Sequence, residues 1–314
     1  MTTMTTSYTR FIGADVGKTA IVVFDSRDNT TRTIPNSPQQ LAAFAAELDG
    51  ACLVVCEATG GHEAALLHAL TQAGLAVHRA DARKVKAFIR SFGILGKTDA
   101  IDARALAQYG RERHAQLALW RAPDPCRDRL QALVLTRSDL VAQRVACNNR
   151  LTAPGAKPVQ IYLLNLIECL SVQIAAIEAD IDALIQAHQP LDKAAKTLRA
   201  IAGIGLRTAA SLLALMPELG SMNRRQAAAL AGLAPHPNQS GSANGYRKTK
   251  GGRPEIKRVL FMAALAAARY NPTLRAFYNK LIANGKKPLV ALTAIMRKII
   301  VIANAKLRIN IAPI

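Results

Sequence analysis

Acidic residues are scarce in this chain of 314 residues. It has 21 Asp and Glu against 41 Lys and Arg, which gives a formal net charge of +20 and a sequence pI near 10.3. A surplus of this size in a folded protein is typical of one that binds a polyanion. Nucleic acid is the leading candidate partner, and an anionic membrane surface is the lesser one. A solvated surface from a GC-rich genome would account for the choice of Arg, but less well for the shortage of acids.

Cysteine occurs in an odd number and in no metal-binding pattern. CxxC spacing and Cys/His clusters are both absent, which argues against a zinc site. Most of the cysteines lie in apolar or helical segments, so we expect reduced core thiols in a cytoplasmic protein. The five are Cys52, Cys56, Cys126, Cys147 and Cys169.

We also expect no membrane-directing segment. The opening stretch MTTMTTSYTR is polar and has no charged region followed by an apolar one, so we expect no secretory leader. No apolar run reaches the ~18 to 20 residues of a bilayer span. We also find no internal repeat or low-complexity tract. With 50% hydrophobic residues, the chain can form two domains with sizeable cores.

Short apolar, β-branched segments dominate the first ~115 residues. Two of them flank Gly17-Lys18-Thr19 and predict a hairpin, and later strands alternate with helices. Because such alternation implies parallel strands, we expect a mixed α/β sheet that begins antiparallel. The expected strands are 9–16, 20–26, 31–36, 51–58 and 75–81, and the expected helices are 37–48, 63–74 and 82–93.

The pattern becomes helical from Pro123 onward. Residues 127–151 and 160–187 predict two long helices broken by TAPGAKP, which indicates a helical hairpin or coiled-coil arm. Such an arm often mediates oligomerisation, although packing within one chain is equally ordinary. Residues 198–216 predict two helices joined at Gly203-Ile204-Gly205. That turn can present backbone N–H groups to a phosphate, or it can be a tight turn without a ligand.

Asp15 lies in the first strand, within GADVGKT. This segment is one residue short of a P-loop and is followed by a strand instead of a helix, so we reject a P-loop. A strand carrying Asp and turning through Gly into a second strand suits the ribonuclease H-like and actin-like superfold. Glu57 closes a later strand, at the kind of sheet edge where α/β proteins bind ligands.

Asp99 and Asp102 add two acids near the start of a helix. Residues three apart share one helix face, and the helix dipole favours acids there, so a single Asp would need no further explanation. Four carboxylates converging on one cleft would repel each other without divalent cations. Two Mg²⁺ or Mn²⁺ ions about 3.5 to 4 Å apart would relieve this repulsion and support phosphoryl transfer.

The motifs GADVGK, VVCEATGG and GKTDAIDARALA resemble, in order and context, the RuvC-like Asp-Glu-Asp-Asp pattern of the IS110/IS1111 transposases and the related pilin-gene invertases. LRAIAGIGLRTAA, LAGLAPHPNQSG, GGRPEIKRVLFMAA and KKPLVALTAIMRKII resemble the C-terminal domain of that family. The resemblance implies an α/β plus α fold and Asp15, Glu57, Asp99 and Asp102 as catalytic metal ligands. The expected parts are a RuvC-like, ribonuclease H-like domain (8–115), a helical coiled-coil-like arm (123–190) and a mainly helical transposase domain (195–314).

The family resemblance also implies a serine nucleophile at Ser240, in the Ser240-Gly241 pair, with Ser242 as the alternative. From the residues alone, Ser240 would be an ordinary loop serine. A phosphoserine ester would keep the energy of the phosphodiester bond, so strands could be exchanged and resealed without ATP. Six cations nearby would contact a nucleic-acid backbone, together with Lys97, Gly203 and Gly205. They are Arg247, Lys248, Lys250, Arg253, Lys257 and Arg258, and the segment RKVKAFIR offers a second basic surface.

Family members resemble RNA-guided recombinases, in which a structured noncoding bridge RNA pairs with donor and target DNA. The resemblance therefore implies DNA and a guide RNA as partners, no membrane, and a dimer or tetramer whose active sites combine the acids of one protomer with the serine of another. The expected location is the bacterial cytoplasm, acting at the nucleoid. Two alternatives stay open: a small-molecule kinase of the actin-like superfold, and a nucleic-acid-binding protein without catalysis.

Overall fold

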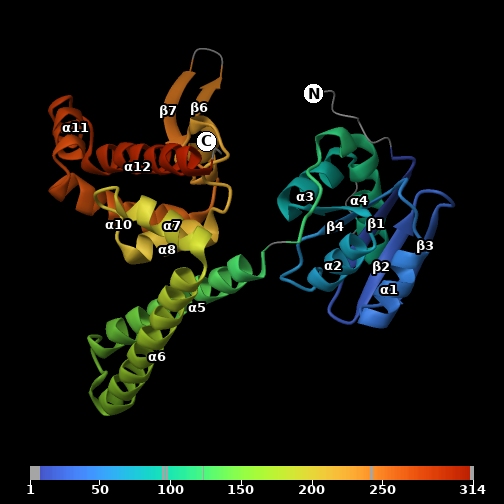
Figure 1. The fold of residues 1–314 in the computed structure, drawn as a ribbon, viewed down its shortest axis with the longest axis horizontal. Coiled ribbons are helices and arrows are strands. Elements are labelled where there is room, and N and C mark those ends of the chain that lie inside the picture. Colours follow the sequence, from blue (N-terminus) through green and yellow to red (C-terminus); the bar gives the residue numbers. More distant parts are fainter. Residues whose placement is uncertain (1–7, 94–95, 97, 123, 241–242, 312–314) are drawn as a thin grey trace. The chain divides into compact units, whose positions relative to one another are not determined.

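The computed structural model describes residues 8–93, 96, 98–122, 124–240 and 243–311. The chain forms two compact units, Met1–Pro123 and Asp124–Ile314 (Figure 1). Three positions named from the sequence, Lys97, Gly241 and Ser242, lie outside the described residues.

Unit 1 contains a five-stranded sheet in the order β3-β2-β1-β4-β5. The first three strands pair antiparallel, whereas β4 pairs parallel with both β1 and β5. The expected mixed sheet that begins antiparallel is therefore confirmed. The strands are β1 (Arg10–Val16), β2 (Ala20–Asp25), β3 (Thr30–Pro35), β4 (Cys52–Glu57) and β5 (Ala76–Ala80).

The helices of unit 1 cover the two faces of this sheet. Alternate strand residues such as Ile12 and Val54 face a core formed with α1 and α2. Phe11 and Val55 face the opposite core, formed with α3 and α4. The helices are α1 (Pro38–Ala46), α2 (Ala64–Gln72), α3 (Ala82–Ser91) and α4 (Asp99–Arg113).

Helix α4 lies directly against β1 because glycine occupies the point of contact. A Cβ atom on Gly13 would lie 1.8 Å from the carbonyl oxygen of Ala103, and one on Gly110 would meet the side chains of Val55 and Phe11. Moving along α4 from Ala103 to Gly110 therefore means moving back along β1 from Gly13 to Phe11. The helix runs antiparallel to β1, so its N-terminus lies at the carboxyl end of that strand.

Unit 2 begins with two long helices, α5 (Pro125–Leu151) and α6 (Gln160–Ala187), which lie side by side as the expected helical hairpin (Figure 1). Near the base of this arm, Leu130 and Ile181 are buried in the core of the unit. The expected pair of helices around Gly203-Ile204-Gly205 is also present. The remaining helices are α7 (Gln189–Arg199), α8 (Leu206–Leu215), α9 (Arg224–Leu230), α10 (Pro254–Tyr270), α11 (Pro272–Ala283) and α12 (Pro288–Ile311).

Ser240 does not lie in a loop, as its residues alone would suggest. It is the last residue of β6 (Pro235–Ser240), which pairs antiparallel with β7 (Ala243–Thr249). The segment is rich in Asn, Gly and Ser, which disfavour strands. It also lacks the alternation of apolar and polar residues that would predict a strand. At its base, Gly232 and Gly252 contact so closely that a Cβ on Gly252 would lie 2.1 Å from the Gly232 nitrogen.

Among the described residues, two helices of unit 2 have the length and hydropathy of a bilayer span, which differs from the expectation that no apolar run is this long. They are Lys157–Ala187 and Pro288–Arg308, with mean hydropathies of 1.5 and 1.6. The difference arises because a mean over a helix tolerates scattered polar residues. Core helices pass the same test, and α12 contributes Ile295 and Ile299 to the core.

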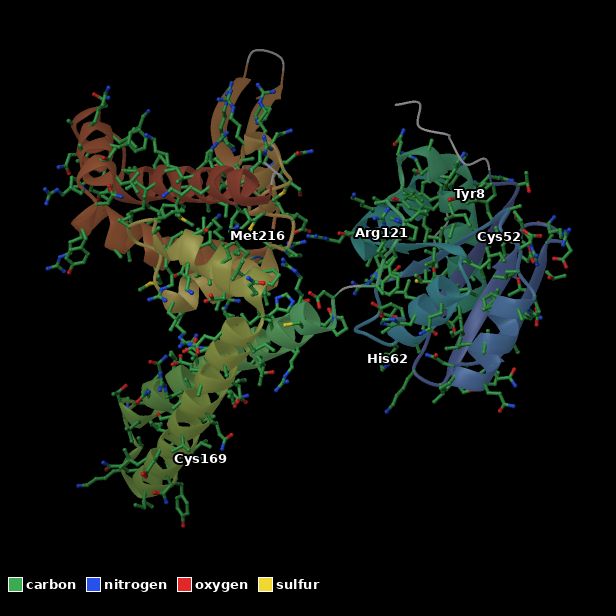
Figure 2. All side chains as sticks on the ribbon, viewed as in Figure 1. Tyr8, Cys52, His62, Arg121, Cys169 and Met216 are labelled. Atoms are coloured by element: carbon green, nitrogen blue, oxygen red, sulfur yellow. The ribbon has the colours of Figure 1, made fainter. Side chains whose placement is uncertain are left out.

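The cysteines are free thiols, as expected, but not all are core residues. Cys52, Cys56 and Cys147 are buried, and burial raises the pKa of Cys56 to about 12. Cys169 on α6 is exposed on the arm, as Figure 2 shows. The buried thiol of Cys56 is therefore protonated and unreactive at neutral pH.

Candidate functional site

Asp15 and Glu57 lie next to each other on neighbouring parallel strands. The register of β1 and β4 pairs Ala14 with Cys56, and Asp15 and Glu57 are the residues that follow. Side chains at the same register of parallel strands face the same side of the sheet, and adjacent strands are about 4.8 Å apart. By alternation from Gly13, that side is the one covered by α4. Both residues are partly buried.

The two acids of α4 reach the same edge of the sheet. Thr98 caps the helix by accepting a hydrogen bond from the Ile101 N–H (3.3 Å), so the helix begins at Asp99. Asp99 and Asp102 lie within the first turn, directly before the contact of Ala103 with Gly13. Because α4 is antiparallel to β1, this turn lies at the carboxyl ends of β1 and β4. The fold thus brings all four acids to one region of unit 1.

The four carboxylates have the chemistry of a magnesium or manganese site, since both ions prefer oxygen ligands. Among the described residues, no three His, Cys, Asp or Glu side chains are gathered as a metal site. The backbone brings the four acids to a common edge of the sheet. Asp15 and Glu57 also make interactions with other groups.

Glu63 organises the loop that follows Glu57, a role that the sequence did not reveal. Its side chain is 2% exposed and accepts hydrogen bonds from the N–H groups of Thr59 (3.1 Å) and Gly61 (2.9 Å). Its other oxygen accepts from Arg79 Nε at 2.8 Å. A buried carboxylate held by several donors is a strong constraint on a loop. The only sequence signal was an acid just before a helix, which usually has no such role.

The basic residues around β7 fall into two groups. Arg247, Lys248 and Lys250 are exposed. Arg253 is engaged inside the unit, because its guanidinium donates to both carboxylate oxygens of Glu218 (2.8 and 2.6 Å) and to the carbonyl of Leu215 (2.6 Å). The exposed group is open to a polyanion, whereas Arg253 fixes the turn between β7 and α10.

The last two of the six cations lie on α10. Lys257 donates to the hydroxyl of Thr249 at 3.2 Å, and Arg258 makes a long contact of 3.5 Å with Glu255. The Arg258 contact is long enough for a phosphate to compete with it.

The two glycines of the Gly203-Ile204-Gly205 turn have different surroundings. Gly203 has a positive φ of 100°, and a Cβ there would lie 2.7 Å from the Cβ of Ala267. It therefore lets the turn pack against α10. Gly205 caps α8 and has open space around it, so the N-terminal N–H groups of α8 are the ones a phosphate could approach.

The second basic segment forms the amphipathic helix α3. Val85 and Phe88 are buried in the core shared with α4, and Asp81 caps the helix by accepting from the Arg83 N–H at 2.8 Å. The side chain of Arg83 is 84% exposed. The helix thus presents cations outward from unit 1.

Known sequences match both units. Residues 12–154 match a family model of DEDD transposases of IS110 type, described as "Transposase". Residues 195–279 match the model described as "Transposase IS116/IS110/IS902 family". The chain belongs to the IS110 family of transposases. The first match includes Asp15, Glu57, Asp99 and Asp102, and the second includes Ser240 and the exposed cations of β7.

Several named proteins resemble this IS110-family chain. The "Pilin gene-inverting protein" of Moraxella lacunata is 30% identical over 262 residues, which cover 82% of this chain and 80% of the relative. The protein of the same name from Moraxella bovis has the same identity and coverage. The "Insertion element IS110 uncharacterized 43.6 kDa protein" of Streptomyces coelicolor is 33% identical over 194 residues, covering 58% of this chain and 47% of the relative.

Proposed function

We propose that this IS110-family transposase is a divalent-metal-dependent recombinase that cleaves and rejoins DNA strands. One observation carries the proposal: β1, β4 and the N-terminus of α4 bring Asp15, Glu57, Asp99 and Asp102 to one edge of the unit 1 sheet. Carboxylates brought to one edge repel each other unless cations lie between them, and divalent metal ions would supply that positive charge.

Asp15, Glu57, Asp99 and Asp102 would hold Mg²⁺ or Mn²⁺ through their carboxylate oxygens. Such ions stabilise the negative charge that develops on phosphate oxygens during phosphoryl transfer. The loop fixed by Glu63 would hold Glu57 in place, and the rigid contact of α4 at Gly13 would fix Asp99 and Asp102. IS110-type DEDD transposases are generally divalent-metal dependent.

Ser240 is the proposed nucleophile. Its hydroxyl oxygen would form a bond to the scissile phosphorus while the bond from phosphorus to one sugar oxygen breaks, and the leaving sugar oxygen would take up the proton. In the reverse reaction, the hydroxyl of a different strand end attacks the phosphoserine and releases Ser240. The number of phosphodiester bonds is conserved, so the exchange needs no ATP.

DNA and a structured guide RNA are the proposed partners. Exposed Arg247, Lys248 and Lys250 beside the hairpin, and the cations of α3, are suited to contact sugar-phosphate backbones of either nucleic acid. Base pairing by an element-encoded bridge RNA would then select donor and target sequences, because backbone contacts carry no sequence information.

A second copy of the chain is the proposed partner of the arm. The far part of α6 exposes large apolar side chains, among them Ile161 (59%), Tyr162 (73%) and Val172 (60%). Few charges interrupt this surface, so a nucleic acid would find little to bind there. If the arms of two chains packed together through this surface, the apolar side chains of both would be buried. Such packing suits a dimer or tetramer.

Recombination in cells tests the catalytic proposal. Asp102→Asn and Ser240→Ala should each abolish the joined product of a donor and target plasmid pair, detected by amplification across the junction. Asp128→Asn is a matched control, because Asp128 is an exposed acid in the first turn of α5. Full activity in the Asp102→Asn or Ser240→Ala variant would contradict the assignment of that residue.

A further inference from the structure

A groove of about 500 Å³ lies between the base of the β6-β7 hairpin and α12. On the hairpin side it is lined by Pro235, Arg247 and Lys248. On the helix side it is lined by Leu289 and Arg297, which lie eight residues apart and therefore share one face of α12. The groove is outside the four-acid region of unit 1.

All the charged side chains that line the groove are positive. Its lining contains three cations, Arg247, Lys248 and Arg297, and no acid. None of the three makes an ion pair with any described residue. Three unpaired cations around one hollow would attract an anion, and phosphate is the anion for which Arg has the best geometry.

Apolar side chains form much of the rest of the lining. Leu233, Pro235, Leu289 and Val290 contribute to it, and Leu289 is 64% exposed. A duplex presents mainly its phosphates to such a surface. Its bases are stacked inside the helix and cannot pack on the apolar side chains. An unpaired nucleotide offers both a phosphate and the face of a base, and a groove of this volume lies within the usual range for small ligands.

We propose that this groove binds an unpaired nucleotide of a nucleic-acid strand, with its phosphate on Arg247, Lys248 and Arg297 and its base against Leu289 and Val290. The inference rests on the proposed function, because a recombinase that separates or pairs strands handles unpaired nucleotides. The strand can be DNA or RNA, which share this chemistry. Arg297 is thereby assigned to nucleic-acid contact, which the sequence alone did not suggest.

Binding of labelled oligonucleotides to the full chain, followed by fluorescence anisotropy, tests the phosphate contact. Arg297→Ala should weaken binding of a single-stranded oligonucleotide by roughly tenfold and lower the slope of log K against log salt by about 0.7. Lys306→Ala is the matched control, because it removes one exposed cation from the same helix away from the groove. It should change binding by less than about twofold. Equal effects of the two substitutions would overturn the proposal.

A second pair of variants tests the base contact. Leu289→Asn should weaken binding of single strands about fivefold, leave duplex binding unchanged, and have no effect on an oligonucleotide made of abasic sites. Leu265→Asn, at a 40% exposed position of α10, is its control. Comparison of single-stranded DNA with single-stranded RNA shows which strand the groove prefers. Equal weakening of duplex and single-strand binding by Leu289→Asn would overturn the proposal.

These measurements are independent of catalysis. If recombination requires Asp102 but Arg297→Ala binds like its control, the groove proposal fails and the recombinase proposal stands. If groove variants lose single-strand binding while Asp102→Asn still recombines DNA, the assignment of the acids fails and the groove proposal stands.

Discussion

Glu63 and Arg79 join the loop after β4 to the neighbouring strand β5. Arg79 donates to one oxygen of Glu63 from Nε (2.8 Å) and from its terminal nitrogen (2.7 Å), while the other oxygen of Glu63 accepts from the loop N–H groups of Thr59 and Gly61. A carboxylate that is 2% exposed thus ties the loop to the sheet directly beside Glu57. The position of a proposed metal ligand depends on a residue six positions later.

Loss of this carboxylate charge should destabilise unit 1 at low pH. Burial raises the pKa of Glu63, but the hydrogen bonds from backbone N–H groups and the charge of Arg79 together hold it below its ordinary value. The stabilisation is therefore present above the unfolded pKa of about 4.3 and is lost as pH falls through the lower folded pKa. Between about pH 5 and pH 3, the free energy of unfolding should fall more steeply for the natural chain than for Glu63→Gln. Parallel curves from denaturant titrations would contradict this.

Substitution at the contact of α4 with β1 should be costly. Gly13→Ala places a methyl group 1.8 Å from the carbonyl oxygen of Ala103, so the helix must move away from the sheet. We expect a loss of about 3 kcal/mol or more in the free energy of unfolding. Gly50→Ala is the control, because a Cβ there meets nothing within 4 Å and its φ is not positive. Equal stability of the two variants in urea titrations would show that α4 does not lie as closely on β1 as described.

Metal binding should depend on the acids of both β1 and α4. Calorimetric titration with Mn²⁺ should show binding to the natural chain, and Asp15→Asn or Asp99→Asn should weaken it at least about tenfold, because each removes a charged oxygen ligand. Asp128→Asn on α5 should leave the titration unchanged. Unaltered Mn²⁺ binding in both ligand variants would place the metal elsewhere.

The elements of unit 1 were predictable because each has a local cause. Ser37 and Pro38 mark the start of α1, and the apolar runs at β1 and β4 fix buried strands. Asp15 and Glu57 could be paired from the sequence, since parallel strands bring their carboxyl ends together. The contact of Gly13 with Ala103, which orients α4, joins residues 90 positions apart and has no local signal.

In unit 2, the roles of several residues could not be predicted from the sequence, because their partners are distant in the chain. Ser240 lies in a ribbon whose Asn, Gly and Ser residues favour turns, and only pairing with β7 makes it a strand. In the sequence, Arg253 is one of several cations in a basic segment. Its structural role depends on Glu218, which lies 35 positions earlier. Arg297 lies within an apolar helix pattern and gains a functional interpretation only when α12 is seen beside the hairpin. Tertiary partners decided the role of each residue, and composition did not.

Arg253 and Lys250 should therefore differ although both belong to the same basic run. The guanidinium of Arg253 donates to both carboxylate oxygens of Glu218 and to the Leu215 carbonyl. The single ammonium group of Lys cannot reproduce this geometry. Arg253→Lys should cost about 1 kcal/mol of unfolding free energy, modest because the pair is partly exposed. Arg253→Gln, which removes the charge, should leave the salt dependence of nucleic-acid binding unchanged. Lys250→Ala should leave stability unchanged and lower the salt slope for duplex DNA by about 0.9. Thermal unfolding and anisotropy on these variants separate the two roles, and a lower salt slope in Arg253→Gln would return Arg253 to the nucleic-acid surface.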